Sequence, residues 1–215
     1  MLMNKTTIVL AAFLAVTSLV LLACGGSSGT SSPEDDTART TCKPDQPPAF
    51  STPADLSADQ KEFQSAERGY TARYPADWEA KANQSQIGNA AGDAFFGPSI
   101  SPSARVNISV FCETVPVGTT SREFTDAKME VMRRVFGGNP SQGEQLQVDG
   151  KDAYLVKYAI GEQTPSAAAP FNAETVQVMF ADERGGWVIS LLAPAGELAT
   201  YRPFFDAFVA SFHEQ

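Results

Sequence analysis

Residues 145–160 read QLQVDGKDAYLVKYAI, which is the clearest signal of a β-hairpin in the chain. Asp149-Gly150 is a dipeptide favoured by the tight type I′ turn, whose two central residues both take positive φ. The flanking segments, 145–148 and 151–160, have the composition and length of strands. We therefore expect two antiparallel strands joined by this turn.

A second pair of strands is expected downstream of this hairpin, and shorter strands are expected upstream of it. Residues 175–180 and 187–192 are apolar runs on either side of the turn sequence DERGG at 182–186. Upstream, apolar residues alternate with polar ones at 106–110, which is the pattern of a half-buried strand. Tyr70, Ala72 and Tyr74 share one face of another strand, which should end at Pro75.

Two amphipathic helices complete the pattern. Thr120 and Glu123 have the spacing of a capping box, although Ser121 could cap instead, and Gly137-Gly138 should end this first helix. Pro203 is tolerable only in the first turn of the second helix. The expected first apolar face contains Phe124, Ala127, Lys128, Val131, Met132, Val135 and Phe136, and the second contains Leu198, Tyr201, Phe205, Phe208, Val209 and Phe212. This order predicts an α+β fold, a mostly antiparallel β-sheet covered by α-helices in an α/β/α sandwich.

The N-terminus has the three parts of a bacterial export signal. Lys5 supplies positive charge, and residues 8–22 form an apolar run of 15 residues, shorter than the roughly 20 that a membrane-spanning helix needs. The run ends in Leu21-Leu22-Ala23-Cys24, which resembles the lipobox of bacterial lipoproteins. The resemblance implies cleavage after Ala23 and lipidation of Cys24, so that residues 1–23 are a signal peptide. The alternative is an ordinary signal peptide with an incidental cysteine.

Composition divides the mature chain into a tether and one domain. Residues 24–62 are rich in Gly, Ser, Thr, Pro and acidic residues, and are expected to be a disordered tether. Residues 63–215 have the size of a single domain. Without Lys5 the formal net charge is 15 − 25 = −10, which argues against nucleic-acid binding because phosphate backbones are repelled. The acidic run Glu34-Asp35-Asp36 is interpreted as a solvated spacer.

Two cysteines remain once Cys24 is lipidated. Cys42 lies in the expected tether, and Cys112 lies at the end of an expected strand. Outside the cytoplasm such a pair often forms a disulfide, which would pin the otherwise loose segment 42–62 onto the domain. The alternative is two free thiols, with Cys112 buried and Cys42 exposed.

The pattern from Arg68 to Phe212 resembles the PsbP-like family, which includes the PsbP subunit of photosystem II, Mog-type proteins and many bacterial lipoproteins. The opening motif GYTARYPADW at 69–78 is similar to that family's start, and Ala210-Ser211-Phe212 is similar to its end. The resemblance implies a fold and a role as an adaptor or assembly factor. The photosynthetic role does not transfer, because no binding residue of that subunit matches this chain.

The sequence carries no recognisable catalytic or metal-binding set. The single histidine, His213, lies two residues from the C-terminus, and the GxSxG nucleophile motif is absent. No close group of His and Cys suggests zinc, so we expect neither a metal nor a cofactor. A distributed carboxylate pair stays open, since its members need not be adjacent. Trp78 and Trp187 are interpreted as core residues, with an aromatic cleft as the alternative.

These observations predict a non-catalytic, extracytoplasmic lipoprotein that binds a protein or another component of the cell envelope. Lipid on Cys24 would hold it to a membrane, the outer one if the cell has two, because Gly25 follows the lipidated cysteine. The loop at 161–170 is the expected contact surface, since loops commonly carry binding. The alternatives are a carrier of a small apolar ligand and a hydrolase that uses a carboxylate pair.

Overall fold

The computed structural model describes residues 38–50, 57–87, 90–101, 104–136, 140–160 and 172–215. The signal peptide, the lipobox with Cys24, and the loop at 161–170 lie outside these residues. Within the described ranges, no helix combines the length and the apolar character needed to cross a bilayer.

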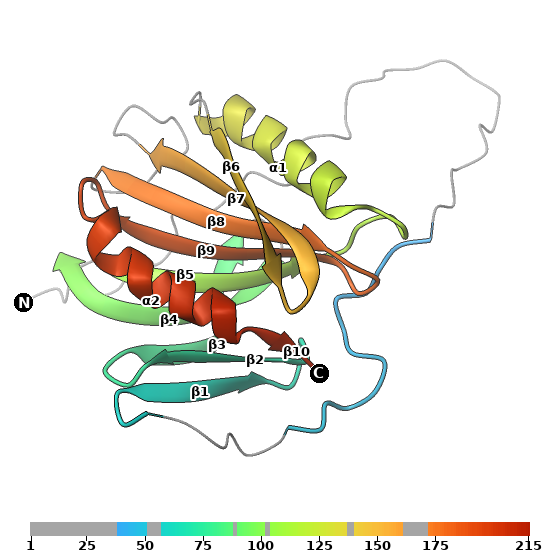
Figure 1. The fold of residues 1–215 in the computed structure, drawn as a ribbon, viewed down its shortest axis with the longest axis horizontal. Coiled ribbons are helices and arrows are strands. Elements are labelled where there is room, and N and C mark those ends of the chain that lie inside the picture. Colours follow the sequence, from blue (N-terminus) through green and yellow to red (C-terminus); the bar gives the residue numbers. More distant parts are fainter. Residues whose placement is uncertain (1–37, 51–56, 88–89, 102–103, 137–139, 161–171) are drawn as a thin grey trace, which may run out of the picture.

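Two antiparallel sheets and two helices make up the described part of the chain (Figure 1). The helices are α1 (Ser121–Phe136) and α2 (Leu198–Ser211). A small sheet has the order β1 (Gln60–Ser65), β2 (Tyr70–Pro75) and β10 (His213–Glu214). A large sheet has the order β3 (Glu79–Ile87), β4 (Ala90–Ser101), β5 (Ala104–Glu113), β9 (Gly186–Pro194), β8 (Ala173–Ala181), β7 (Lys151–Ile160) and β6 (Ser141–Val148). The expected α+β class is therefore confirmed.

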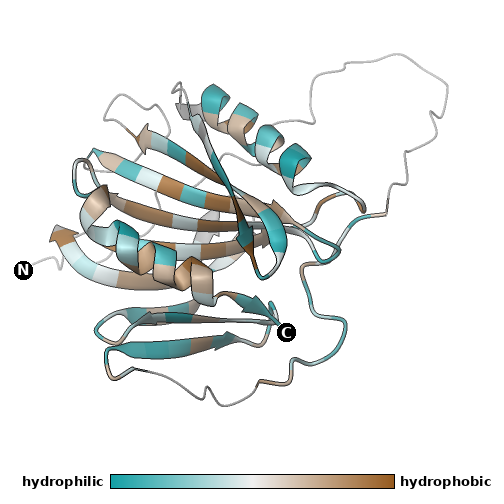
Figure 2. Cartoon of the chain, viewed as in Figure 1, coloured by the Kyte–Doolittle hydropathy of each residue, from teal (hydrophilic) through white to brown (hydrophobic). Residues whose placement is uncertain are grey.

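The large sheet is the middle layer, because its two faces are buried by different elements. Val178 on β8 belongs to the main core with Phe205 and Phe208 of α2 and Tyr70 of β2. The next residue, Met179, points to the opposite face and packs with Phe124, Met129 and Met132 of α1. One face is thus covered by α2 and the small sheet, and the other by α1. Hydrophobic residues concentrate in the central strands, whereas β1 at the outside is largely hydrophilic (Figure 2).

The hairpin expected around Asp149-Gly150 is present as β6 and β7. Asp149 and Gly150 have φ of 49° and 76°, the positive values that a type I′ turn requires. Val148 pairs with Lys151, so the turn has two residues. The expected second pair is present as β8 and β9, in which Phe180 pairs with Trp187.

The capping box of α1 has formed as the sequence predicts. The Glu123 N–H donates to Thr120 Oγ1 at 3.2 Å, and the Thr120 N–H donates to Glu123 Oε2 at 2.9 Å. The apolar face is rotated from the expected one, since Met129 is buried whereas Ala127 is exposed.

The second helix also differs in detail from expectation. It begins at Leu198, so Pro203 lies inside it, beyond the first turn. The proline therefore removes one helical N–H···O bond, and packing compensates for the loss. Phe205 and Phe208 are fully buried, and Val209 and Phe212 nearly so.

Structured residues precede residue 63, the expected start of the domain. β1 begins at Gln60, before the expected start at residue 63. Thr40, inside the expected tether, is 6% exposed. Thr40 is buried because hydrogen bonds to Val115 and the neighbouring disulfide of Cys42 hold this part of the chain against the domain. These contacts join residues that are far apart in the sequence.

Candidate functional site

Segments far apart in sequence meet at one end of the domain, around a disulfide between Cys42 and Cys112. Their Cα atoms are 5.6 Å apart, within the usual range for a disulfide. The sulfurs lie against the backbone of Gly185 in the β8–β9 turn. A Cβ atom built there would lie 2.5 Å from Cys112 Sγ and 2.7 Å from Cys42 Sγ, so only glycine fits. The bridge that the sequence left open is therefore present, and it ties the N-terminal segment to β5.

Backbone hydrogen bonds continue this attachment on either side of the disulfide. The Thr40 N–H donates to the Val115 carbonyl at 2.9 Å, and the Val115 N–H donates to Thr40 Oγ1 at 2.9 Å. The Cys42 N–H donates to the Arg184 carbonyl at 2.8 Å. Residues 38–42 thus lie along the chain that follows β5, where Arg39 forms a bridge with Pro116.

A buried carboxylate, Asp93 on β4, organises the neighbouring β1–β2 turn. Its side chain is fully buried and accepts hydrogen bonds from Ser65 Oγ at 2.8 Å and the Tyr70 hydroxyl at 2.9 Å. The Arg68 guanidinium donates to its other oxygen at 3.0 Å, as does the Asn83 N–H at 3.1 Å. Burial and the charge of Asp93 raise the pKa of the Tyr70 hydroxyl well above its ordinary value of 10.0, which keeps this donor neutral. Every oxygen of Asp93 is therefore bonded, as a buried charge requires.

A second polar cluster holds the C-terminal strand. The side chain of Glu214 on β10 is 7% exposed, and its carboxylate accepts hydrogen bonds from Lys151 Nζ at 2.9 Å and from Arg184 at 3.2 Å. Asp182 in the β8–β9 turn is 3% exposed and lies 3.5 Å from Lys151 Nζ. Burial and the adjacent Asp182 carboxylate together raise the pKa of Glu214 to about 7. These are two enclosed carboxylates that share the positive charge of Lys151.

The Asp149-Gly150 turn also contacts the C-terminus. Asp149 accepts a hydrogen bond from the Glu214 N–H at 3.0 Å and lies 2.5 Å from His213 Nδ1. Although partial burial opposes the change, these two partners lower the pKa of Asp149 below its ordinary value of 3.8. The single histidine thus contacts the turn, and no nucleophile accompanies it among the contacts of the described residues.

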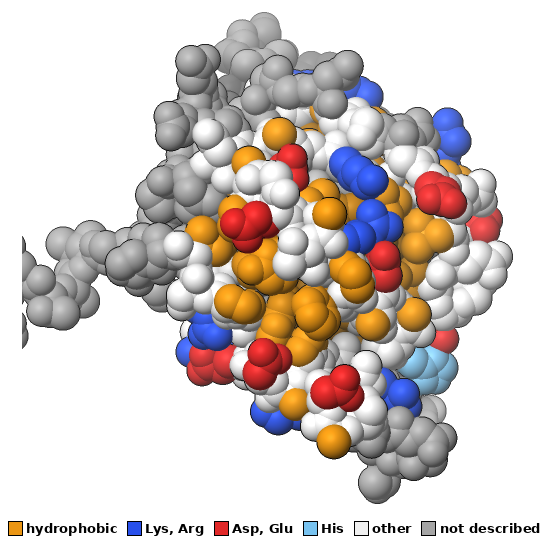
Figure 3. Space-filling model, turned by 60° about the vertical axis from the view of Figure 1, so that its left-hand side comes forward, with side chains coloured by type: hydrophobic (Ala, Val, Ile, Leu, Met, Phe, Trp, Pro, Cys, Tyr) orange, Lys and Arg blue, Asp and Glu red, His pale blue; other side chains and the backbone are white. Residues whose placement is uncertain are grey.

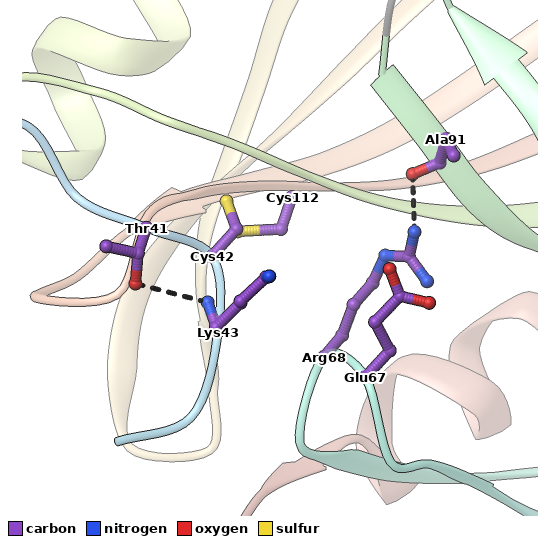
Figure 4. Close-up of a pocket in the computed structure, with 7 residues that line it drawn as sticks. All are labelled: Thr41, Cys42, Lys43, Glu67, Arg68, Ala91 and Cys112. Carbon is purple, nitrogen blue, oxygen red and sulfur yellow. Dashed lines mark hydrogen bonds between the residues drawn. A yellow bond between two sulfur atoms is a disulfide. The ribbon is translucent and has the colours of Figure 1, made fainter.

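Two shallow hollows open beside the β1–β2 turn. One, of about 280 Å³, is bordered by Phe63, Ser65 and Ala82 above the Arg68–Asp93 pair. The other, of about 150 Å³, is bordered by the disulfide, Lys43 and Glu67 (Figure 4). Both lie at the surface and not between the large sheet and its helices, which is where a carrier of an apolar ligand would need its cavity.

An apolar surface lies elsewhere on the domain. Seen from the side on which α2 begins, hydrophobic side chains gather into a patch (Figure 3). On α2, Phe204 is 43% exposed, and its ring centroid lies 6.1 Å from that of Trp78. Trp78 itself is 4% exposed and Trp187 is fully buried, so the aromatic cleft considered from the sequence is not present.

Metal-binding and acid–base arrangements can be judged for the described residues. No group of three or more His, Cys, Asp or Glu in this part of the chain has a metal-binding arrangement. Glu214 lies close to the Asp182 carboxylate and its pKa is raised, which is a feature that a hydrolase would need. Both side chains are nearly enclosed in the structure, and Lys151 and Arg184 hold them.

Sequence reasoning found the two cysteines but neither polar cluster. Asp93 stands between Ala90-Ala91-Gly92 and the apolar stretch 94–96, and a charge in such a position is a usable signal of a buried ion pair. The pairing of Glu214 with Asp182 had no local signal, because it depends on how β10 pairs with β2.

Comparison with known proteins bears on the fold. No protein-family model matches the chain, and no curated protein sequence matches it. The solution structure of cyanobacterial PsbP (CyanoP) from Synechocystis sp. PCC 6803 matches with a TM-score of 0.53 at 17% identity, covering 77% of this chain and 98% of that one. The fold is PsbP-like. The expectation drawn from residues 68–212 is therefore confirmed at the level of fold.

Two further structures match the PsbP-like domain less well. One is a Pseudomonas aeruginosa protein of unknown function, PA94, described as a putative regulator, with 11% identity and a TM-score of 0.49 over 74% of this chain and 99% of that one. The other is LpqN, involved in cell envelope biogenesis of Mycobacterium tuberculosis, with 13% identity and a TM-score of 0.49 over 71% of this chain and 88% of that one.

Proposed function

We propose that this chain is an extracytoplasmic lipoprotein whose PsbP-like domain is a non-catalytic module that binds a protein of the cell envelope. Lipid on Cys24 holds it to a membrane, which is the outer membrane where the cell has two. The observation that carries the proposal is the disulfide between Cys42 and Cys112. Disulfides persist in oxidising compartments, and this one stands downstream of an export signal that ends in a lipobox.

The attachment of the N-terminal segment also supports a tethered module. Cys42 is only eighteen residues beyond Cys24, and a chain of that length spans at most about 60 Å when fully extended. The disulfide end of the domain is therefore the end held near the membrane. A domain held at that short distance is suited to contact other envelope proteins.

Phe204 offers a contact for such a partner. Large exposed hydrophobic side chains are enriched at binding surfaces when they adjoin other apolar groups, and Phe204 adjoins Trp78. The hydrolase alternative is not favoured because Asp182 and Glu214 are enclosed. The carrier alternative is not favoured because the hollows described above lie at the surface.

Site-specific photocrosslinking in intact cells tests the proposal. A photoreactive phenylalanine analogue at position 204 is compared with the same analogue at Val117, another exposed large hydrophobic, which is 60% exposed. We expect one discrete crosslinked product at position 204 that is absent at position 117. Equal diffuse labelling at both positions would refute a specific partner at this surface.

The enzyme alternative has its own test. Asp182→Asn and Glu214→Gln variants that retain the partner crosslink and the cellular phenotype of the wild type support a non-catalytic role. Loss of the phenotype in a variant that still folds and still crosslinks would favour catalysis by the carboxylate pair.

A further inference from the structure

The disulfide is accessible from solvent through the smaller hollow. That hollow has a volume of about 150 Å³ and is bordered by both cysteines together with Lys43, Glu67 and Arg68. Figure 4 shows the disulfide and Lys43 on one side of it, and Arg68 and Glu67 on the other. Cys112 is only 8% exposed, whereas Cys42 is half-buried. An incoming reagent would therefore reach the sulfur of Cys42 first.

Among the charged residues that border the hollow, Lys43 is the cation available to a thiolate, whereas Glu67 keeps its negative charge. Arg68 is neutralised by Asp93, and Glu67 accepts a hydrogen bond from the Asn83 amide at 2.6 Å. Lys43, by contrast, is exposed and has no ion pair among the described residues. A free ammonium group stabilises an attacking or departing thiolate, because the thiolate is the reactive form of cysteine.

Besides the disulfide, residues 38–50 are held mainly by hydrogen bonds of residues 38–42, which include one from the Arg39 guanidinium to the Thr114 carbonyl at 2.6 Å. Of these residues, Thr40 alone is buried, and its two hydrogen bonds join it to Val115. The other backbone contacts are the Cys42 N–H to the Arg184 carbonyl and the Val117 N–H to the Ala38 carbonyl, each 2.8 Å long. A segment with so few buried groups opens readily once its covalent link is removed.

We propose that the Cys42–Cys112 disulfide is a reducible clasp, opened by an extracytoplasmic dithiol protein that inserts its reactive thiolate into the hollow. The thiolate attacks Cys42 Sγ, the Cys42–Cys112 bond breaks, and Cys112 leaves as a thiolate that takes up a proton. The second thiol of the dithiol then attacks the mixed disulfide and releases Cys42 as a thiol. The dithiol protein is oxidised to its disulfide, and its two electrons reduce the clasp.

Opening the clasp lengthens the tether, a consequence that rests on the proposed function because it requires lipid on Cys24. With the clasp closed, eighteen residues separate the lipid from the domain; with it open, the first fixed element is β1 at Gln60, thirty-six residues away. The maximum extended span rises from about 60 Å to about 120 Å. Reduction would therefore extend the distance at which the module can meet its partner.

Reduction of the native protein tests the clasp without reference to the lipid. The mature chain with Cys24→Ser is incubated, without denaturant, with a reduced thioredoxin-type dithiol protein, and free thiols are alkylated and counted by intact mass. We expect both cysteines to be labelled. Trypsin should then cut the Arg39–Thr40 bond at least tenfold faster than it cuts this bond in the oxidised chain. Thr40 is buried when the clasp is closed, so this bond reports on opening.

Two variants serve as controls for the clasp. A Cys42→Ser/Cys112→Ser chain should be cut at Arg39 equally fast with and without the dithiol. A Lys43→Gln chain, which retains the disulfide, should be reduced several-fold more slowly by the same dithiol. Resistance of the wild-type disulfide until urea unfolds the domain would overturn the proposal, as would protection of Arg39 after full reduction.

The clasp and the anchor can fail separately. If the disulfide is reduced in the native protein but the protein purified from membranes carries no lipid, the clasp proposal stands and the tethered function is refuted. A lipidated chain whose disulfide resists the dithiol would retain the function and remove the clasp.

Discussion

Glu214→Gln should change how the stability of the domain depends on pH. Glu214 is nearly buried beside Asp182, and burial together with that neighbour raises its pKa from 4.5 to about 7. Glutamine has the same shape and keeps a hydrogen bond to Lys151, but it does not ionise. The variant therefore isolates the cost of ionising Glu214, which comes from its burial and from the neighbouring Asp182.

The sign and size of the effect follow from the shifted pKa. The folded chain binds the Glu214 proton more tightly than the unfolded chain, so this contribution to stability is complete below pH 4.5 and is lost as the pH rises to about 7. A shift from 4.5 to about 7 corresponds to about 3 kcal/mol in the free energy of unfolding. Between pH 5 and pH 8 we expect the wild type to lose about 2 kcal/mol through this group.

Urea unfolding followed by circular dichroism at several pH values measures the difference. The wild type should lose stability from pH 5 to pH 8, whereas Glu214→Gln should lose about 2 kcal/mol less over the same interval. Glu183→Gln, which alters an exposed carboxylate in the β8–β9 turn, is the matched control and should follow the wild type. Parallel curves for the wild type and Glu214→Gln would refute the reasoning.

Three further changes test the rest of the site, each by urea unfolding at pH 7. Asp93→Ala leaves the Arg68 charge buried without its partner and should cost about 3–5 kcal/mol. Ser65→Ala removes one donor to Asp93 and should cost only about 1 kcal/mol. Equal costs would contradict the central place given to the ion pair. Cys42→Ser/Cys112→Ser opens a loop with a sequence separation of 70 residues and should cost about 4 kcal/mol, and an unchanged stability would mean that the bridge restrains nothing in the unfolded chain. Gly185→Ala places a Cβ atom 2.5 Å from Cys112 Sγ and should cost about 1–3 kcal/mol through overpacking; a neutral effect would show that the turn adjusts without strain.

The sequence predicts well those elements whose signals are local. The Asp149-Gly150 turn, the capping box of Thr120 and Glu123, and the apolar face of α2 are determined by neighbouring residues, and each is present. Local signals also identify Trp187 as a core residue. The expectation that Pro203 is tolerable only in the first turn was wrong, because Pro203 lies beyond the first turn of a helix that begins, as its apolar face predicts, at Leu198.

Elements with a weak local signal were missed. The hairpin of β3 and β4 is rich in Ala, Gly, Asn, Gln and Ser, which lack the β-branched alternation of a typical strand. Its register shifts between Lys81 and Ser85, where Asn83 has φ of 56°. That conformation lets the Asn83 N–H reach Asp93, a long-range requirement that composition does not express.

The candidate site also combines one feature that the sequence indicates with others that it does not. The disulfide could be anticipated because the number of cysteines and the export signal together indicate an oxidising compartment. The clusters at Asp93 and Glu214 could not, since each depends on three or more segments that meet only in the folded domain.

The intact mass of the protein purified from membranes tests the central claim most directly, with a Cys24→Ala chain as the comparison. The account predicts a chain that begins at Cys24, carries acyl chains on that residue and is two hydrogens lighter through its disulfide, whereas the Cys24→Ala chain carries no lipid. A wild-type mass without acyl chains would contradict the account, because the domain would then have no anchor of the proposed kind.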